Sequence, residues 1–379
     1  MIARRGLLAL ASLHRFSAIA GLAGLAGLPA SRAHATALVA PRELVFPRDH
    51  GAHPDTRTEW WYATGWLHDA QASTDTPAFG FQLTFFRSRT GLADKLKSRF
   101  AARQLLFAHA ALTDLAGQRL LHAERIARWN GDERAPRAAA ALADTRVHIG
   151  DWRFERDGNA YRAALGDAAA GFSYRLTLST TQPLLLQGDA GFSRKGPDPA
   201  QASHYYSQPQ LAVGGELQLG GAKPRAVRGK AWLDHEWSES LLPDGAVGWD
   251  WIGINFNDGS ALTAFQLRRA DASAVWAGGS LRPRDGTTRV FTAAEVRFEP
   301  LAHWTSAATR ARYPVRWRVH TPIGAFELRA LLDAQELDSR ASTGTVYWEG
   351  LAELLDASGR QRVGLGYLEL TGYAGPLRL

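Results

Sequence analysis

Along most of the chain, apolar and aromatic residues alternate with polar residues in short segments that end at Gly, Asp or Pro. A period of two is typical of β-strands. Tight turns such as NDGS at 257–260 join neighbouring segments, as in antiparallel meanders that close into barrels or sandwiches. The predicted strands are 59–67, 79–88, 105–114, 145–157, 161–180, 215–221, 227–237, 249–269, 289–300, 313–331, 344–354 and 362–373. We therefore expect an all-β fold.

Two segments are compatible with helices. They are AARQLLFAHAAL at 101–112 and RAAAALADTR at 137–146, of which the second is short, rich in alanine and suited to a surface helix between strands. Neither changes the expected fold class.

The strand pattern lapses at 238–248, where Pro243, Asp244 and Gly245 cluster. The halves on either side resemble each other in strand density. About 340 residues without the leader are enough for two hydrophobic cores. We expect two domains of the same plan, at 36–240 and 241–379.

The N-terminal segment has the features of a secretory signal peptide. Arg4 and Arg5 precede an apolar run, and a small-residue cleavage site ends near Ala35. The paired arginines also permit twin-arginine export. A membrane anchor is the alternative, but the uninterrupted apolar segments are shorter than the roughly 20 residues of a spanning helix. We expect a signal peptide at 1–35 and a periplasmic or secreted protein.

Charge and cysteine content narrow the function classes. Removing residues 1–35 lowers the formal net charge from +7 to +3, because this segment holds four arginines and no acid. The rest of the chain has no basic run or binding module, so nucleic acid is not an expected partner. The chain has no cysteine, and its stability must come from burial.

The 13 tryptophans are a second conspicuous feature. Residues two apart in a strand share a face, so Trp249 and Trp251 point the same way and Asp250 points the opposite way. Tryptophans either fill barrel interiors or line a cavity for a long apolar ligand. The pattern leaves both roles open.

The segment GKAWLDHEWSES at 229–240 concentrates acid–base groups between tryptophans. The same parity places Trp232, Asp234 and Glu236 on one face, and Leu233, His235 and Trp237 on the other. Either face offers acid–base chemistry if it lines a cavity, since burial raises the pKa of a carboxyl group. Pairing of the two carboxylates with arginines is the structural alternative.

Other polar residues in apolar surroundings are secondary candidates. Glu59 precedes Trp60, Trp61 and Tyr62, so it either forms a buried ion pair with Arg57 or Arg87 or takes part in chemistry.

His109 lies alone in an apolar segment, where a histidine is usually a core residue with its hydrogen bonds satisfied. Segment 202–211 places His204, Tyr205 and Tyr206 where they can reach a ligand.

Several chemistries lack their motif. No Gly-x-Ser-x-Gly elbow occurs, and HEWSE at 235–239 lacks the second histidine of a zinc-protease helix. Phosphate loops and dinucleotide fingerprints are also missing. We predict neither a cofactor nor a metal.

Four stretches together resemble one known family. They are FPRDHGAHPDTRTEWWYATGWL (46–67), GDAGFSRKG (188–196), ASHYYSQPQL (202–211) and GKAWLDHEWS (229–238). They are similar to the secreted AttH-like proteins, often described as predicted secreted hydrolases and related to the carotenoid 1,2-hydratases. The resemblance implies two lipocalin-like β-barrel domains in tandem, with a site in the first barrel and near the junction.

The resemblance also implies an activity. The related hydratases add water to an isoprenoid double bond, which requires an acid, a cavity that tolerates a carbocation, and a positioned water. Their His-x-Trp pair corresponds to His235 and Trp237, whereas their following tyrosine and aspartate are not matched around 262–265.

Two hypotheses follow from the residues and the resemblance. The first is an acid–base enzyme, a hydratase or hydrolase-like protein, acting on an isoprenoid, carotenoid-like or lipid substrate. The second is a carrier that binds a hydrophobic ligand without chemistry. Association with a membrane surface remains open.

Site residues follow from the enzyme hypothesis. The expected catalytic residues are Asp234, His235 and Glu236. The expected substrate-binding residues are Glu59, Trp60, Trp61, Tyr62, His204, Tyr206, Trp237, Trp249 and Trp251.

Overall fold

A computed structural model describes residues 39–91 and 102–377 of the chain. Residues 37–379 form one compact unit. The predicted signal peptide at 1–35 lies outside the described residues. Among the residues that are described, no helix is long and apolar enough to cross a membrane.

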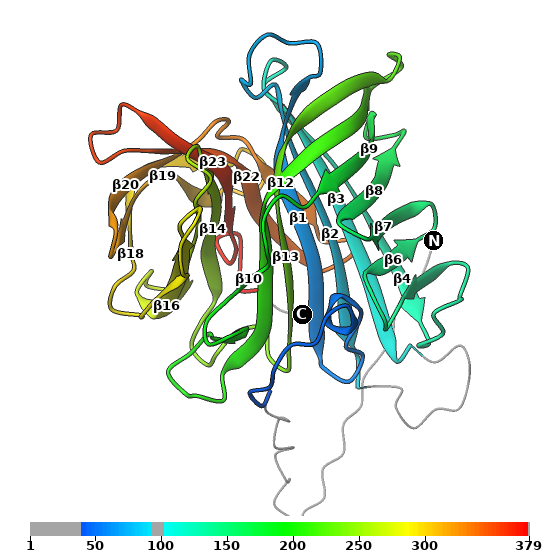
Figure 1. Cartoon of the computed structure of the whole chain (residues 1–379), viewed down its shortest axis with the longest axis horizontal. Coiled ribbons are helices and arrows are strands. Elements are labelled where there is room, and N and C mark those ends of the chain that lie inside the picture. The colour runs from blue at the N-terminus through cyan, green and yellow to red at the C-terminus, as the bar shows by residue number, and fades with distance from the viewer. Residues whose placement is uncertain (1–38, 92–101, 378–379) are drawn as a thin grey trace, which may run out of the picture. The chain divides into compact units, whose positions relative to one another are not determined.

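The first antiparallel sheet is built from the N-terminal strands (Figure 1). Its strands are β1 (Thr58–Asp69), β2 (Phe79–Arg89), β3 (Gln104–Asp114), β4 (Arg119–Trp129), β5 (Ala138–Ala140), β6 (Arg146–Ile149), β7 (Trp152–Asp157), β8 (Ala160–Asp167), β9 (Phe172–Ser179), β10 (Leu185–Leu186), β11 (Phe192–Arg194), β12 (Ala202–Leu219) and β13 (Arg225–Ser238). The order is β4-β3-β2-β1-β13-β12-β9-β8-β7-β6-β5, with β10 and β11 paired to β12. The terminal strands β4 and β5 approach each other, so this sheet is a nearly closed barrel.

The second antiparallel sheet uses the C-terminal strands. They are β14 (Gly248–Phe256), β15 (Ala261–Arg268), β16 (Ala274–Arg282), β17 (Arg289–Phe291), β18 (Arg297–Thr305), β19 (Arg312–Thr321), β20 (Gly324–Ala330), β21 (Glu336–Ser339), β22 (Thr345–Leu355) and β23 (Arg362–Leu370). The order is β17-β16-β15-β14-β23-β22-β20-β19-β18, with β21 paired to β22. The expected all-β fold with two antiparallel sheets is confirmed.

The two segments considered for helices contain strands and no helix where they are described. Gln104–Asp114 forms β3, and Ala138–Ala140 forms the short strand β5. Pairing with neighbouring strands therefore overrides the helix preference of alanine. Within 39–91 and 102–377, the only helix is the 3₁₀ turn η1 (Arg48–His50).

The first sheet ends with β13 at Ser238 and the second begins with β14 at Gly248. The expected boundary region at 238–248 is thus the connection between the sheets. The exact domain limits of 36–240 and 241–379 stay predictions.

Strand β1 and residues 231–238 of β13 are almost entirely buried on both faces, and this arrangement positions the site. Residues opposite each other on paired strands share a face, as Trp61 and His235 do. Trp61 and Leu233 belong to the core of the first sheet. On the other face, Tyr62 belongs to an apolar cluster that also includes Trp251 of the second sheet. Alternate residues of these two strands therefore face either the barrel core or the second sheet.

Candidate active site

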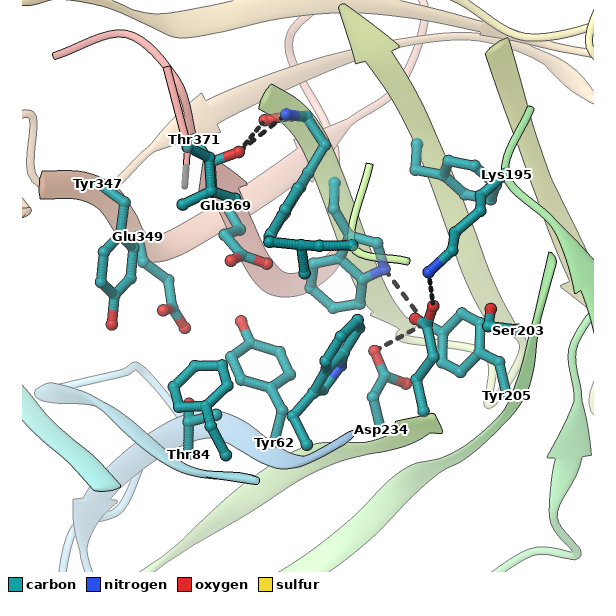
Figure 2. Close-up of a pocket in the computed structure, with 18 of the residues that line it drawn as sticks. Tyr62, Thr84, Lys195, Ser203, Tyr205, Asp234, Tyr347, Glu349, Glu369 and Thr371 are labelled. Carbon is teal, nitrogen blue, oxygen red and sulfur yellow. Dashed lines mark hydrogen bonds and ion pairs between the residues drawn. The ribbon is translucent and has the colours of Figure 1, made fainter. Parts of the chain in front are cut away.

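A cavity lies between the two sheets and encloses about 1070 Å³ of empty space, including the part that opens to solvent. Its walls come from β1, β2, β3, β11, β12 and β13 of the first sheet and from β14, β15, β22 and β23 of the second. Aromatic side chains make up much of the lining, among them Trp60, Trp249 and Trp251. Figure 2 labels three of the lining tyrosines, Tyr62, Tyr205 and Tyr347. Such a cavity suits an apolar ligand held by a few polar groups.

Asp234 lies in the cavity wall and accepts three hydrogen bonds. Its Oδ1 accepts from Ser207 Oγ at 2.5 Å and from Trp232 Nε1 at 2.6 Å, and its Oδ2 accepts from the Tyr205 hydroxyl at 2.7 Å. Burial raises the pKa of Asp234 to about 7, although these three hydrogen bonds oppose the shift.

The donors to Asp234 are fixed by their own donors. Trp251 Nε1 donates to the Tyr205 oxygen at 3.2 Å, and Gln187 Nε2 donates to Ser207 Oγ at 2.8 Å. Each hydroxyl group therefore has its own hydrogen left for Asp234. This network holds Asp234 as an acceptor.

Glu236 lies on the same face of β13 as Asp234 and pairs with Lys195. The two charged groups are 3.6 Å apart, and Lys195 Nζ also donates to Ser238 Oγ at 2.7 Å. Burial raises the pKa of Glu236 and lowers the pKa of Lys195, while each group favours the ionised form of the other. Both residues line the cavity, and Figure 2 labels Lys195.

A second acid pair, Glu349 and Glu369, lies on the wall formed by the second sheet. The two residues are directly opposite on β22 and β23, and both side chains reach toward the cavity near Tyr62 (Figure 2). Burial raises the pKa of Glu369 to about 7. Burial and then the neighbouring Glu369 raise the pKa of Glu349 well above its usual range. Two adjacent buried carboxyl groups cannot both ionise at low cost, so this pair retains a proton near neutral pH.

The opposite face of β13 contains a different polar cluster, centred on Glu59. Glu59 accepts hydrogen bonds from Arg87 Nε at 2.7 Å, from His235 Nε2 at 3.0 Å and from the His53 ring at 2.7 Å. Although burial opposes ionisation, Arg87 and then His53 hold the pKa of Glu59 well below its usual range. The expected ion pair of Glu59 is therefore with Arg87.

His53 connects Glu59 to Asp49. Its Nδ1 lies 2.7 Å from Glu59 Oε1, and its Nε2 lies 3.0 Å from Asp49 Oδ1. The ring stacks on Trp237 with centroids 3.7 Å apart and planes at 4°.

His235 is neutral in the same network. Burial lowers its pKa to about 4, despite its hydrogen bond to Glu59. Since Nε2 donates to Glu59, Nδ1 accepts from the Tyr206 hydroxyl at 3.1 Å, and Tyr206 in turn accepts from His50 Nδ1 at 2.7 Å. Every polar atom of His235 is thereby used within the barrel.

Three residues of this cluster have the spacing of metal ligands. Donor atoms of His53, Glu59 and His235 lie within 4.8 Å of one another. Arg87 already pairs with Glu59 at 2.7 Å. A metal ion held by these three residues would lie next to that buried guanidinium and be repelled by it. These residues fit an ion-pair network better than a metal centre, and the sequence-based expectation of no metal stays a prediction.

Two further histidines were considered from the sequence, and only one of them lines the cavity. His109 lines the cavity and joins the two sheets through Tyr347 at 2.8 Å and Ser342 Oγ at 2.9 Å, and Ser342 also donates to Glu124. It is a core histidine with its hydrogen bonds satisfied. His204 lies beside Trp237, with ring centroids 5.4 Å apart, and does not line the cavity.

The predicted site residues divide between the two faces. The six that line the cavity are Trp60, Tyr62, Asp234, Glu236, Trp249 and Trp251. The six that lie on the other side are Glu59, Trp61, His204, Tyr206, His235 and Trp237. As expected, alternate residues of 232–237 lie on opposite faces of the strand. One face lines the cavity and the other lies within the barrel.

The sequence reasoning missed Lys195, Glu349 and Glu369 as site residues. Each glutamate interrupts an apolar strand, in YWEGL at 347–351 and YLELT at 367–371. That interruption was the available signal. Its significance depends on the pairing of β22 with β23, which the sequence alone does not specify.

Comparisons with known proteins were made for the whole chain. The AttH-like family model matches residues 37–373. The crystal structure of a protein assigned to AttH from Nitrosomonas europaea is 46% identical, with a TM-score of 0.81, covering 89% of this chain and 99% of that chain. No curated protein matches the chain.

More distant similarity concerns the fold alone. Kievitone hydratase from Nectria haematococca matches with a TM-score of 0.64 and 14% identity, over 90% of this chain and 95% of that chain. CghA matches with a TM-score of 0.50 and 15% identity, over 89% of this chain and 95% of that chain.

Proposed function

Because the chain belongs to the AttH-like family and shares its fold with a hydratase, we propose that it adds water to an alkene of an apolar substrate. The observation that carries this proposal is the Glu349–Glu369 pair, which retains a proton inside an aromatic cavity. Isoprenoid, carotenoid-like and lipid alkenes are the substrate classes that we propose.

The proposed reaction begins with proton transfer. The protonated member of the glutamate pair gives its proton to one alkene carbon, so the π bond becomes a C–H bond and the other carbon becomes a carbocation. The indole rings of Trp60, Trp249 and Trp251 stabilise this positive charge. Carboxylates in the same cavity add electrostatic stabilisation.

Water then completes the addition. Its oxygen bonds to the carbocation, and one of its protons passes to the carboxylate left by the first step. The product is the alcohol, and the glutamate pair again holds one proton. No oxidant, reductant or cofactor is needed for this balance.

Asp234 and Glu236 have supporting roles in this proposal. Asp234 accepts three hydrogen bonds and orients Tyr205, and Glu236 is neutralised by Lys195. Asp234, in its ionised form, contributes negative potential near the carbocation. His235 acts through the barrel network rather than on the substrate, since its polar atoms are already used.

The test is an assay in ¹⁸O-labelled water with compounds that carry a terminal trisubstituted alkene. Wild type is expected to give an alcohol containing one labelled oxygen. Glu349→Gln and Glu369→Gln are expected to lower kcat by about 10²–10⁴-fold, the usual contribution of a general acid.

A matched control uses Glu353→Gln on the same strand. Glu353 pairs with Arg329 and does not line the cavity, so this variant should retain wild-type turnover. Turnover that survives both cavity substitutions contradicts the proposal. If an alkene binds unchanged to wild type and variants without product, the chain is a carrier instead.

We also propose export to the periplasm or the medium, on the basis of Arg4, Arg5 and the apolar run that follows. Mass spectrometry of the protein from a periplasmic fraction should find a new N-terminus near Thr36. Recovery of the intact Met1 terminus from the cytoplasm would contradict this proposal.

A further inference from the structure

The cavity has more acidic groups than basic groups. Its described lining contains four carboxyl groups and one lysine, and burial lowers the pKa of its histidine, His109, to about 3. Lys195 forms an ion pair with Glu236, with 3.6 Å between Lys195 Nζ and Glu236 Oε1. Asp234, Glu349 and Glu369 therefore have no cationic partner among the described residues that line the cavity.

Two buried polar atoms of the lining also lack a partner. Among the residues that the structure describes, the Tyr62 hydroxyl and Glu349 Oε1 have no hydrogen-bond partner within 3.5 Å. The two groups face each other, and the Tyr62 hydroxyl is near enough to lower the pKa of Glu349, against the larger effect of burial. Tyr62 is 5% exposed and Glu349 is 3% exposed. An unsatisfied buried group costs free energy, so these two atoms are suited to a ligand that donates hydrogen bonds.

The surrounding rings are suited to a positive charge. Trp60, Trp249 and Trp251 line the same cavity, and Lys195 Nζ already lies 5.9 Å from the centroid of the Trp60 ring. Indole faces attract cations through their quadrupole. A neutral ligand would leave that attraction unused.

We propose that the cavity binds protonated amines with an apolar body, whose ammonium group donates to Glu349 and Tyr62 while the apolar body packs against the tryptophans. The ligand class is thus an organic ammonium ion. This inference goes beyond the proposed hydration, because it concerns binding and does not require turnover. The two are compatible, since an ammonium ion imitates the charge of the carbocation.

Binding of a cation is linked to ionisation of the glutamate pair. The groups that face the pair are Tyr62 from β1, Asp234 and Glu236 from β13, Tyr347 and Tyr367 from β22 and β23, and Lys195 beside β11. A bound ammonium favours the ionised pair, so the retained proton is released on binding. Affinity for the amine should therefore increase between pH 5.5 and pH 8.

Benzylamine and benzyl alcohol provide a matched pair of probes. They have the same heavy-atom skeleton and both donate hydrogen bonds, but only benzylamine is charged in this pH range. Titration calorimetry at pH 7.5 should show benzylamine binding to wild type at least about tenfold more tightly, as a desolvated cation–π contact and an ion pair together imply.

Variants locate this preference within the cavity. Glu349→Gln should abolish it, and Glu353→Gln, on the same strand outside the cavity, should preserve it. Circular dichroism establishes that each variant is folded. If Glu349→Gln does not fold, Glu369→Gln and Tyr62→Phe replace it in the titrations, and they should lose the preference for benzylamine over benzyl alcohol as well.

Several outcomes would overturn the inference. They are equal or tighter binding of benzyl alcohol, no binding of either probe, and a preference that persists in both glutamate variants. If wild type prefers benzylamine but forms no alcohol from any alkene, only the proposed function is contradicted. If wild type forms the alcohol but shows no preference for benzylamine, only this inference is contradicted.

Discussion

Strand β13 separates two polar clusters that differ in how completely their groups are paired. On the barrel side, Glu59 accepts from Arg87, His53 and His235, and Arg87 donates in addition to Gln104. On the cavity side, Glu349 retains an unpartnered oxygen within the described residues. Both clusters are buried, so burial does not distinguish them.

The difference teaches which buried acids are available for chemistry. An acid whose hydrogen bonds and charge are fully matched is locked in one protonation state and contributes to stability. An acid with a raised pKa and an open oxygen can exchange a proton with a ligand. This criterion underlies our proposal that the cavity pair carries the chemistry and the barrel cluster contributes to stability. The sequence had placed its acid–base candidates on both faces.

The largest expected effect comes from removing Arg87. Arg87→Met leaves Glu59 buried without its main counter-charge, and should lower the free energy of unfolding by about 3–5 kcal/mol. Urea denaturation measures the loss. Arg316→Met is the control, because Arg316 is exposed and its pair with Glu327 is expected to contribute about 0–1 kcal/mol. Equal effects of the two substitutions would remove the distinction between the clusters.

The second prediction concerns pH. The folded pKa of Glu369 is about 7 against an ordinary 4.5, so the folded state binds more protons between these values and its stability falls as pH rises. Glu369→Gln should remove about 2 kcal/mol of this loss between pH 5 and pH 8. Denaturation midpoints of wild type and variant at both pH values measure it.

The barrel cluster should behave in the opposite way. The folded pKa of Glu59 is well below 4.5, so its contribution to stability is present above pH 4.5 and is lost as pH falls below that value.

The Glu369 prediction fails if the denaturation midpoints of Glu369→Gln and wild type change equally between pH 5 and pH 8. That result would show that the cavity pair is already ionised in the folded protein at pH 5.

A smaller effect separates the tryptophans of the two faces. Trp237→Phe weakens the stack on His53 and leaves a void, and should cost about 1–2 kcal/mol of stability. Trp249→Phe, at the half-buried cavity wall, should cost less stability and weaken ligand binding instead. Thermal unfolding and ligand titration of both variants test this, and the reverse pattern would assign the site to the barrel.

The smallest expected effect on stability concerns Asp234. It tests whether Asp234, like Glu59, has its hydrogen bonds fully paired. Ser207→Ala removes one of its three hydrogen bonds and should cost about 1 kcal/mol, with a further rise in the pKa of Asp234. Carboxyl chemical shifts followed by NMR against pH report that rise. An unchanged titration would indicate that Ser207 does not donate to Asp234.

The sequence was informative where a property repeats along one strand. Period-two alternation predicted the sheets, and parity predicted that Trp249 and Trp251 share a face. It also separated Asp234 from His235 correctly. Parity could not say that both faces of β13 are covered, because that depends on a second sheet packing against the first.

The missed residues show the same limit. Glu349 and Glu369 form a pair only because β22 and β23 align them, and Lys195 reaches Glu236 from the loop after β11. Long-range register has no local signal in these segments. An isolated glutamate in an apolar strand is the nearest local indication.

Because each sheet supplies part of the cavity wall and the sheets are consecutive in the chain, the two halves of the chain can be varied separately. A cut in the connection between Ser238 and Gly248 leaves Asp234 on one fragment and the glutamate pair on the other. Co-expressed fragments can then be recombined, with one first half combined with many second halves from related chains. Each combination changes half of the cavity wall at once while the strands of the other half stay the same, which gives protein engineers a route to new ligands by shuffling.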